Sequence, residues 1–265
     1  MNWAVSNIAW PNELNQSALG LLKKFEINQI EIAPSKIWPD PFAVSPNEAQ
    51  EFKRSMNQLG FDIVALQSLL YGRPELKIFE SAASRQETSN YLLKMIDLAE
   101  QLGAKVVVFG SPKNRQRGAL SLTDAVNMAI PFFKSIGDYA CAREIHFCFE
   151  ANATHYGCDF INTTDEANDL VTAVNSPGFN LHLDLGNMIL SAEDPLLQIN
   201  KYAKIAKHFH LSAPALKPIH ELINLDRIVP LLQTFNHTVS LEMLSGKDDL
   251  ADLTTSLQSI KNSIR

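Results

Sequence analysis

The stretch NLHLDLGNM, residues 180–188, places a carboxylate, Asp184, at the end of a run that otherwise reads as a buried strand. The three leucines within 181–185 would face one side of that strand, and His182 and Asp184 the other. An antiparallel strand with one solvated face would tolerate this pattern. A strand inside a parallel barrel would need a reason for the charge.

Strand-like runs recur on both sides of this stretch at regular intervals, and helical segments separate them. Residues 18–27, ALGLLKKFEI, repeat apolar residues at helical spacing, and residues 88–103, TSNYLLKMIDLAEQLG, end on Gly103 as a helix with a glycine cap would. Strand and helix therefore alternate along the chain. The strand-like runs are WAVSNIA (3–9), QIEIA (29–33), DIVALQS (62–68), KVVVFGS (105–111), IHFCFEA (145–151), NLHLDLG (180–186), KHFHLSA (207–213) and TVSLEML (238–244).

Eight strand–helix units in 265 residues give about 33 residues each, close to the repeat of a (β/α)8 barrel. An open, doubly wound parallel sheet also alternates, but no G-x-G-x-x-G motif follows the first strand, and eight units favour closure. No linker or change of composition divides the chain. We therefore predict an α/β protein with a single TIM-barrel domain over residues 1–265. The long connections after strands two, four and five would lie on the catalytic face of that barrel.

Composition argues against several classes of partner. Hydrophobic residues make up 46% of the chain and charged residues 20%, enough for one large core. The formal net charge of −6, without a basic block, argues against nucleic acid and against an anionic membrane surface. We expect a small-molecule partner.

The cysteines and the N-terminal segment indicate a cytoplasmic protein. Cys141, Cys148 and Cys158 form no C-x-x-C pattern and cannot all pair, which favours a reducing compartment. The segment MNWAVSNIAW, residues 1–10, lacks the basic start and apolar run of a signal peptide, and no stretch is long enough to span a bilayer. We therefore expect neither secretion nor a transmembrane segment.

Each of the last four strands ends on a side chain that can bind a metal ion. Taken alone, such an Asp would read as a turn former or helix cap, and such a His as a core residue. Residues at the same depth on successive barrel strands converge on the axis, however, and three carboxylates gathered there without a cation would repel one another. The set suits one divalent ion, with Mn²⁺ expected and Mg²⁺, Co²⁺ or Zn²⁺ as alternatives. The four residues are Glu150, Asp184, His210 and Glu242.

With these residues and the strand LGAKVVVFGSP (102–112), the sequence resembles the xylose isomerase-like TIM-barrel superfamily, in particular its sugar phosphate isomerase/epimerase branch. That branch includes ketose 3-epimerases, hydroxypyruvate isomerases and inosose dehydratases. The resemblance covers the whole chain and is most specific in the second half. The family's metal ligands, a Glu, an Asp, a His and a Glu after strands five to eight, match the four residues above. Related barrels often form dimers or tetramers, which leaves a homo-oligomer open.

The resemblance implies proton transfer next to a carbonyl group. A divalent ion with open positions would polarise the C=O of a sugar and acidify the neighbouring C–H, so that proton removal gives an enediolate. A base and an acid on opposite faces are then needed for isomerisation or epimerisation. In family members that epimerise, the glutamates of strands five and eight take these roles, which implies Glu150 and Glu242 as catalytic residues. The expected substrate is a carbohydrate, with or without a phosphate.

Further residues are candidates for contacts to the substrate or to the ligands. Glu31 and Gln67 end strands two and three and could hydrogen-bond sugar hydroxyls, although a strand-end cap explains Gln67 equally well. His208 precedes His210 by two residues and could orient a ligand, touch the substrate or be a buried structural histidine. Asn187 stands where the family commonly has a His. An amide there can bind a hydroxyl but cannot carry a proton near neutral pH.

Two basic features suggest an anionic group on the substrate. The loop SPKNRQRG (111–118) would place Lys113, Arg115 and Arg117 on the catalytic face, where a phosphate or carboxylate would suit them; a solvated loop is the alternative. Lys217 follows strand seven, where the family usually has an acidic residue and a downstream Arg. It could bind an anionic group or simply be a solvated lysine.

Three other functions remain open. A dehydratase acting on a polyol or keto-sugar would use the same metal and base but expel a hydroxyl. An endonuclease IV-like phosphodiesterase would need histidines on the early strands, and the chain has none before His146. A sugar-binding barrel without turnover is a third reading, which the four intact ligands disfavour and Asn187 leaves open.

Overall fold

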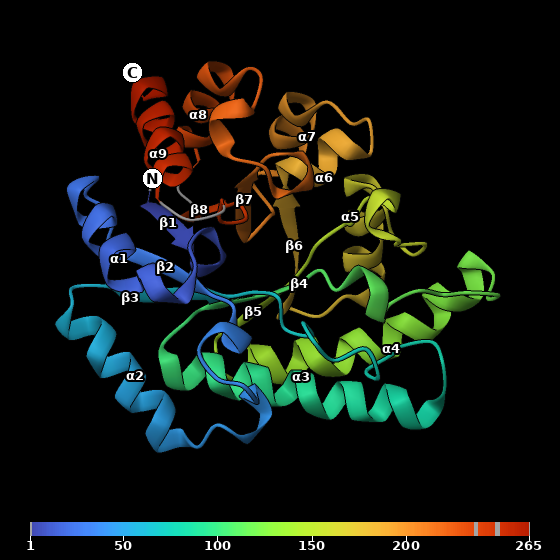
Figure 1. Ribbon diagram of the computed structural model, residues 1–265. Helices are drawn as coiled ribbons and strands as arrows, with labels where there is room; N and C mark the ends of the chain where they lie inside the picture. Colours follow the sequence, from blue (N-terminus) through green and yellow to red (C-terminus); the bar gives the residue numbers. More distant parts are fainter. Residues whose placement is uncertain (1, 236–237, 247–249, 265) are drawn as a thin grey trace.

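The computed structural model describes residues 2–235, 238–246 and 250–264, and within them the parallel strands form one closed barrel (Figure 1). Each strand pairs with its neighbours in sequence, and β1 (Asn2–Ser6) pairs with β8 (Thr238–Glu242), so the sheet has no open edge. The predicted TIM barrel is confirmed. The strands between these two are β2 (Gln29–Ile32), β3 (Asp62–Leu66), β4 (Val106–Phe109), β5 (His146–Phe149), β6 (Phe179–Asp184) and β7 (His208–Ser212).

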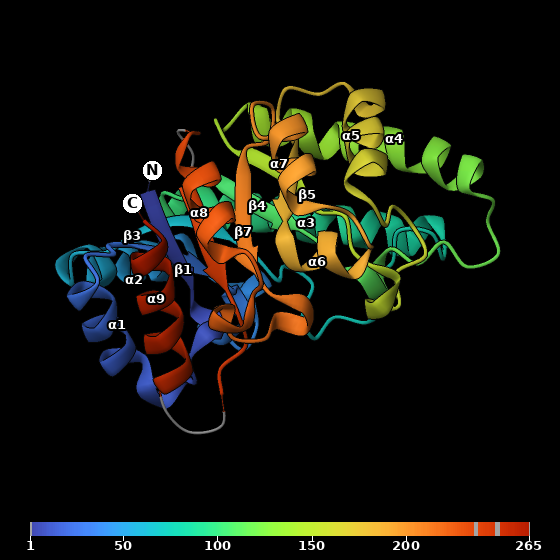
Figure 2. The same ribbon diagram turned by 90° about the horizontal axis from the view of Figure 1, so that it is seen from above.

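Helices surround the barrel, as the two perpendicular views show (Figures 1 and 2). The last helix lies beside the first, where Lys261 Nζ is 6.0 Å from the ring centre of Phe25. No helix in the described ranges is long and apolar enough to cross a membrane. The helices are α1 (Asn15–Lys24), α2 (Pro46–Gln58), α3 (Ala82–Leu102), α4 (Leu122–Cys141), α5 (Thr164–Val174), α6 (Leu185–Leu190), α7 (Pro195–Tyr202), α8 (Leu225–Gln233) and α9 (Ala251–Ser263).

Local sequence signals set where these helices begin and end. The Ser45 and Glu48 side chains form a reciprocal capping box at the start of α2, which satisfies two backbone N–H groups there. Gly103 ends α3 with φ 85°, as the sequence predicted. The helix starts earlier than residue 88, however, because the Ser81 side chain accepts a hydrogen bond from the Ser84 N–H.

The space inside the barrel is divided between an apolar and a polar half. Side chains of β3, β4 and β5 form a small apolar cluster of Ala65, Val106, Val108 and Cys148. The remaining strands and the residue that follows β3 direct polar side chains inward, and several of these are almost fully buried. They are Ser6, Glu31, Gln67, His182, His208, His210 and Ser240.

Strand register brings the predicted metal ligands to one end of the barrel. Asp184 pairs with His210 in the β6–β7 ladder, and Ser212 pairs with Glu242 in the β7–β8 ladder. The long loops after β2, β4 and β5 lie at this end, as expected. A fourth long connection, residues 67–81 after β3, was not predicted. Its backbone is held by the Asn114 amide, which donates to two of its carbonyl oxygens at 2.7 and 2.8 Å.

Phe133 joins α4 to the outside of the barrel, because its ring packs against aromatic rings of β4, β5 and β6. We expect Phe133→Ala to lower the free energy of unfolding by about 3–5 kcal/mol, since a buried cavity would replace those contacts. Urea unfolding would measure the loss. Leu197→Ala is the control, because Leu197 is 62% exposed, and its effect should stay within about 0.5 kcal/mol. Equal effects of the two substitutions would contradict this account.

Candidate metal centre

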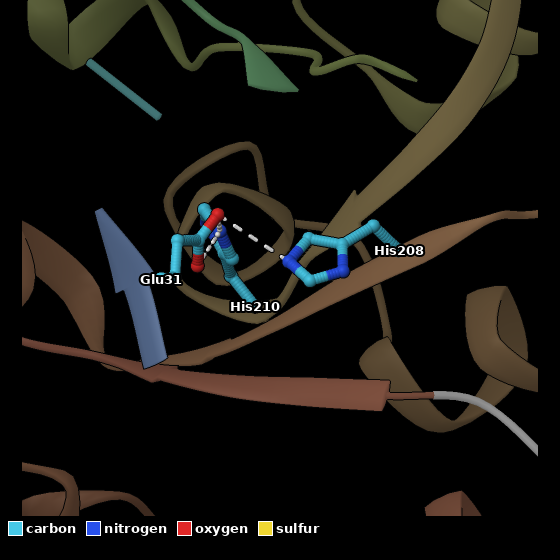
Figure 3. Close-up of side chains that lie close together, drawn as sticks. All are labelled: Glu31, His208 and His210. Carbon is cyan, nitrogen blue, oxygen red and sulfur yellow. Dashed lines mark hydrogen bonds and ion pairs between the residues drawn. The ribbon is translucent and has the colours of Figure 1, made fainter. Parts of the chain in front are cut away.

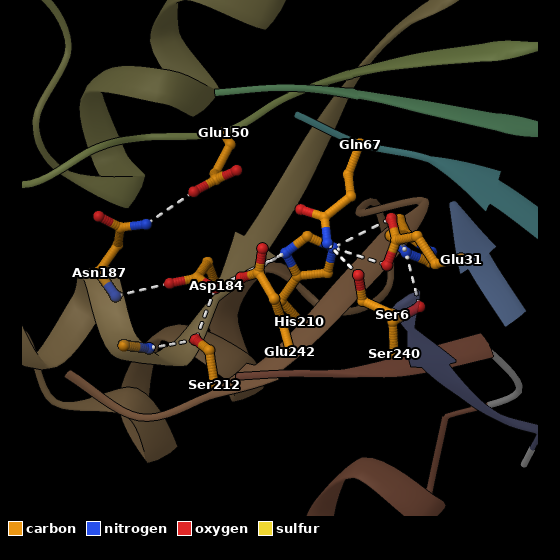
Figure 4. Close-up of polar contacts among 12 residues, drawn as sticks. Ser6, Glu31, Gln67, Glu150, Asp184, Asn187, His210, Ser212, Ser240 and Glu242 are labelled. Atoms are coloured by element: carbon orange, nitrogen blue, oxygen red, sulfur yellow. Dashed lines mark hydrogen bonds and ion pairs between the residues drawn. The ribbon is translucent and has the colours of Figure 1, made fainter. Parts of the chain in front are cut away.

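Asp184 ends β6 and at the same time caps α6. Its Oδ1 atom accepts a hydrogen bond from the Asn187 N–H at 2.6 Å, and its Oδ2 atom accepts one from the Ser212 hydroxyl at 2.6 Å (Figure 4). The positive end of α6 and the hydroxyl donor both favour the charged carboxylate. The alternation in NLHLDLG therefore directs Asp184 into the barrel mouth, where these donors hold it.

His210 presents one ring nitrogen to this carboxylate. Its Nδ1 atom lies 3.8 Å from Asp184 Oδ2 and 3.2 Å from Glu242 Oε2. Nδ1 is buried and has no hydrogen-bond partner of acceptable geometry among the described residues. Ligand atoms of Asp184, His210 and Glu242 all lie within 4.8 Å of one another, which is close enough to surround one cation.

Glu150, the fourth predicted ligand, follows β5 and is held by two amides. Asn152 Nδ2 and Asn187 Nδ2 each donate to Glu150 Oε1 at 2.7 Å. Glu150 belongs to a second group of close ligand atoms, with His182 and His210, and not to the same close group as Asp184 and Glu242. The four predicted residues are thus brought to one place through His210.

The electrostatics of these carboxylates favour a bound cation. Burial raises the pKa of Glu150 to about 8, and the charges of Asp184 and Glu242 contribute to this rise. Burial and Glu242 likewise raise the pKa of Asp184 to about 6. A divalent ion would supply the missing positive charge and keep both groups ionised. The Nδ1 atom of His210, 3.2 Å from Glu242 and 3.8 Å from Asp184, and the crowded carboxylates therefore fit a metal ion.

Glu31 and His208 lie beside His210, inside the barrel (Figure 3). Glu31 is fully buried, and His210 Nε2 is 3.0 and 3.2 Å from its two carboxylate oxygens. His208 Nε2 approaches the same carboxylate at 3.4 Å and the Ser240 hydroxyl at 3.2 Å. Burial alone would raise the pKa of Glu31, but the two imidazoles hold it well below its usual range. Glu31 is therefore a buried anion between two histidines.

Three of the predicted metal ligands, Glu150, Asp184 and Glu242, line a pocket of about 180 Å³ at the carboxyl end of the strands. Gln67, a predicted substrate contact, lines it and donates a hydrogen bond to the Ser6 hydroxyl. Asn187 also lines it, and its Oδ1 accepts from the Ala153 N–H at 2.9 Å. The other polar or charged residues of the lining include Glu150, Asn152, Tyr156, Asp184, Ser212 and Glu242.

The predicted basic residues have three different environments. Arg115 is fully buried, stacks over the Phe149 ring and donates to the Glu150 carbonyl oxygen at 2.8 Å, so it supports the strand end instead of facing solvent. Lys113 is exposed and lines a second groove of about 620 Å³ beside the pocket. Lys217 is exposed and paired with Glu221 at 3.4 Å.

Sequence reasoning did not single out several residues of the site. Ser212 and Asn152 hold the Asp184 and Glu150 carboxylates, and Tyr156 lines the pocket. His182 lies in the barrel interior with no hydrogen-bond partner at either ring nitrogen among the described residues. Strand alternation did indicate the inward direction of His182. Asn152 and Tyr156 belong to a loop, for which no such periodicity exists.

Comparisons with known proteins agree with the fold. A model of the xylose isomerase-like TIM barrel family matches residues 19–262 of this chain. Inosose dehydratase 1 of Bacillus cereus is 24% identical over 166 residues, which are 56% of this chain and 52% of that protein. The chain thus spans about half the length of the curated relatives it matches.

Solved structures resemble the whole barrel. An L-ribulose 3-epimerase superposes with a TM-score of 0.78 at 15% identity, covering 99% of this chain and 96% of that chain. A family 2 AP endonuclease from Brucella melitensis superposes with a TM-score of 0.77 at 17% identity, covering 100% of both chains. At these identities the likeness establishes the fold alone.

Gly110, at the end of β4, leaves room for the Glu150 carboxylate. A Cβ atom there would lie 2.8 Å from Glu150 Oε2 and 3.2 Å from Asn152 Oδ1. We expect Gly110→Ala to displace Glu150 and to weaken Mn²⁺ binding about 10-fold or more, as measured by calorimetric titration. Gly20→Ala is the control, since an added Cβ in α1 meets no atom within 4 Å. Unchanged affinity in Gly110→Ala would show that Glu150 contributes nothing to the cation.

Proposed function

The chain belongs to the xylose isomerase-like TIM-barrel family, and on that premise we propose that it is an enzyme that isomerises or epimerises a sugar with one divalent metal ion. The observation that carries the proposal is the cluster of Asp184, His210 and Glu242, whose ligand atoms all lie within 4.8 Å of one another beside the pocket. A site of carboxylate oxygens and one imidazole suits Mn²⁺, which we propose as the ion. Asp184, His210, Glu242 and Glu150 would hold it.

The proposed reaction moves one proton beside a sugar carbonyl. When bound, the ion would polarise that carbonyl and acidify the adjacent C–H. Glu150 would remove the proton, and the two amides on its Oε1 would keep its carboxylate oriented. Glu242, three strands further around the barrel, would return a proton from the other side. Return to the same carbon inverts it, and return to the neighbouring carbon moves the carbonyl.

Polar side chains of the pocket are the proposed contacts to the sugar hydroxyls. Gln67 and Asn187 both line the pocket and can donate or accept hydrogen bonds there. Glu31 and His208 are proposed to act on the metal ligands instead, because both are buried beneath the pocket. In this proposal, Gln67 and Asn187 bind the sugar hydroxyls, while Glu31 and His208 orient the metal ligands from inside the barrel.

A dehydratase is the second candidate, because the curated relatives that the chain matches are named inosose dehydratases. The same residues would serve. Glu150 would remove the proton beside the carbonyl, and Glu242 would protonate a hydroxyl on the next carbon, which then leaves as water.

The groove beside the pocket supports the proposal that the substrate carries an anionic group. Both cavities share Ser68, Ser111, Pro112 and Tyr156 in their linings, so one molecule can occupy both. Lys77 and Lys113 line the groove, and Lys77 Nζ is anchored on the Lys113 carbonyl oxygen at 2.6 Å. We propose Lys113 and Lys77, and not the buried Arg115 or the paired Lys217, as the cations that meet a phosphate or carboxylate.

Solvent-deuterium exchange tests the proposed reaction. The Mn²⁺-loaded protein is incubated in D₂O with ketoses, keto-inositols and their phosphates, and products are followed by NMR and mass spectrometry. We expect deuterium at the carbon beside the carbonyl, and an exchange rate about 10²–10⁴-fold lower in Glu150→Gln and Glu242→Gln. The control is Glu144→Gln, an exposed glutamate that precedes β5 at the other end of the barrel.

Elemental analysis of the wild type and of an Asp184→Ala/Glu242→Ala variant accompanies this test. About one equivalent of metal, lost in the variant, is expected. A product that is lighter than the substrate by one water molecule would show a dehydratase instead of an isomerase. Bound metal without exchange or dehydration of any substrate would contradict both and leave a binding protein.

Lys77→Ala/Lys113→Ala tests the anionic group. We expect KM to rise about 10-fold for the phosphorylated or carboxylated form of the substrate and to stay unchanged for the neutral form, because each lysine can contribute a charge-assisted hydrogen bond. Lys217→Ala is the control for loss of an exposed lysine after β7. Equal turnover of both forms by wild type and variant would remove the proposed anion site.

A further inference from the structure

Glu31 is a charged group whose burial the proposed reaction does not explain. Its side chain is 0% exposed and does not line the pocket, so it cannot touch a substrate there. Burying an ionised carboxylate is costly unless it is hydrogen-bonded and paired. The groups that approach it are His210 Nε2 and His208 Nε2 (Figure 3). Its role must therefore lie in what it does to these imidazoles.

The contact with His210 directs Nε2 of the ring at Glu31 and Nδ1 at the acids of the barrel mouth. An ionised carboxylate only accepts hydrogen bonds. His210 Nε2, at 3.0 and 3.2 Å from the two Glu31 oxygens, must therefore be the donor. In the neutral ring this arrangement leaves the lone pair on Nδ1, and Nδ1 is the nitrogen that faces Asp184 and Glu242. The same contact also orients the imidazole ring relative to β7.

We propose that Glu31 is a positioning residue of the metal centre, which holds His210 with Nε2–H bound to Glu31 and Nδ1 directed at the cation. His208 supports Glu31 from the other side and is itself anchored by the Ser240 hydroxyl at 3.2 Å. The inference rests on the proposed function only in requiring that the cluster bind a metal ion. Carboxylates that orient a metal-bound imidazole typically raise metal affinity about 10–100-fold.

A second cation between Glu31, His208 and His210 is the competing reading, since their ligand atoms also lie within 4.8 Å of one another. That ion would replace the proton on His210 Nε2, and it would sit where all three side chains are at most 1% exposed. The existing hydrogen bonds already satisfy the carboxylate without it. The two readings differ in metal stoichiometry.

The test compares wild type, Glu31→Gln and Ser240→Ala. The glutamine side chain would keep the shape of Glu31 but remove its charge. Ser240→Ala removes the hydroxyl that anchors His208 and leaves the side chains of Glu31 and His210 unchanged. Zn²⁺ affinity is measured by competition with a chromophoric chelator. Long-range ¹H–¹⁵N spectra of histidine-labelled, Zn²⁺-loaded protein give the tautomer of each ring, and the His210 signals are identified by their absence in His210→Gln.

We expect wild type to bind one Zn²⁺ through Nδ1 of a His210 ring protonated at Nε2. Glu31→Gln should bind Zn²⁺ about 10–100-fold more weakly, and Ser240→Ala should change affinity less than about threefold. Wild type with Zn²⁺ on Nε2 of His210, or with two equivalents of Zn²⁺, overturns the inference even if Glu31→Gln fails to fold. So does a folded Glu31→Gln that matches wild type in affinity and tautomer.

These outcomes are separable from failure of the proposed function. A wild type that holds Zn²⁺ through Nδ1 but exchanges no substrate proton contradicts the proposed reaction and leaves the role of Glu31 intact. A Glu31→Gln variant with full affinity and a normal tautomer contradicts only the role of Glu31. A wild type that binds none of Mn²⁺, Mg²⁺, Co²⁺ and Zn²⁺ overturns both.

Discussion

The imidazole of His210 lies between carboxylates on both of its edges, and the rest of the site depends on this arrangement. Glu31 accepts from Nε2 inside the barrel, while Glu242 and Asp184 face Nδ1 at the mouth. A neutral imidazole can donate at one nitrogen only, so the inner contact decides what the outer nitrogen can offer. The inner Glu31 thus complements the outer acids, and the proposed metal centre depends on polar residues at two depths of the barrel.

Burying so many ionisable groups costs free energy, and these groups are distributed unevenly over the strands of the barrel. Its apolar cluster of Ala65, Val106, Val108 and Cys148 lies on β3 to β5, while the buried ionisable groups lie on β2, β6 and β7 and at the mouth. The hydrophobic stabilisation of the fold comes mainly from outside the barrel, where helices such as α4 pack on the sheet. The interior can therefore hold polar groups that a single compact core would exclude.

Much of this arrangement was predictable from the sequence, because it follows from periodicity. Alternation fixes which side of a strand Asp184 and His210 occupy, and parallel register in a closed barrel brings strand ends to one mouth. The partner of Glu31 was not predictable, since contact across the barrel depends on strand tilt and stagger and not on spacing in sequence. Arg115 was expected to meet an anionic group of the substrate or to lie in a solvated loop. It is buried because a guanidinium can satisfy backbone carbonyl oxygens that a loop would otherwise leave unpaired.

The side chains of Asn114 and Arg115 link the loops around the pocket to one another. Asn114, after β4, holds the backbone of the loop that follows β3, and its neighbour Arg115 holds the loop that follows β5. In many barrels, loops at the catalytic face can be exchanged one at a time to change specificity. Here hydrogen bonds from Asn114 and Arg115 join the three loops to one another. Grafting a single loop from a relative would leave buried amide and guanidinium groups without acceptors, so redesign of specificity has to move all three together.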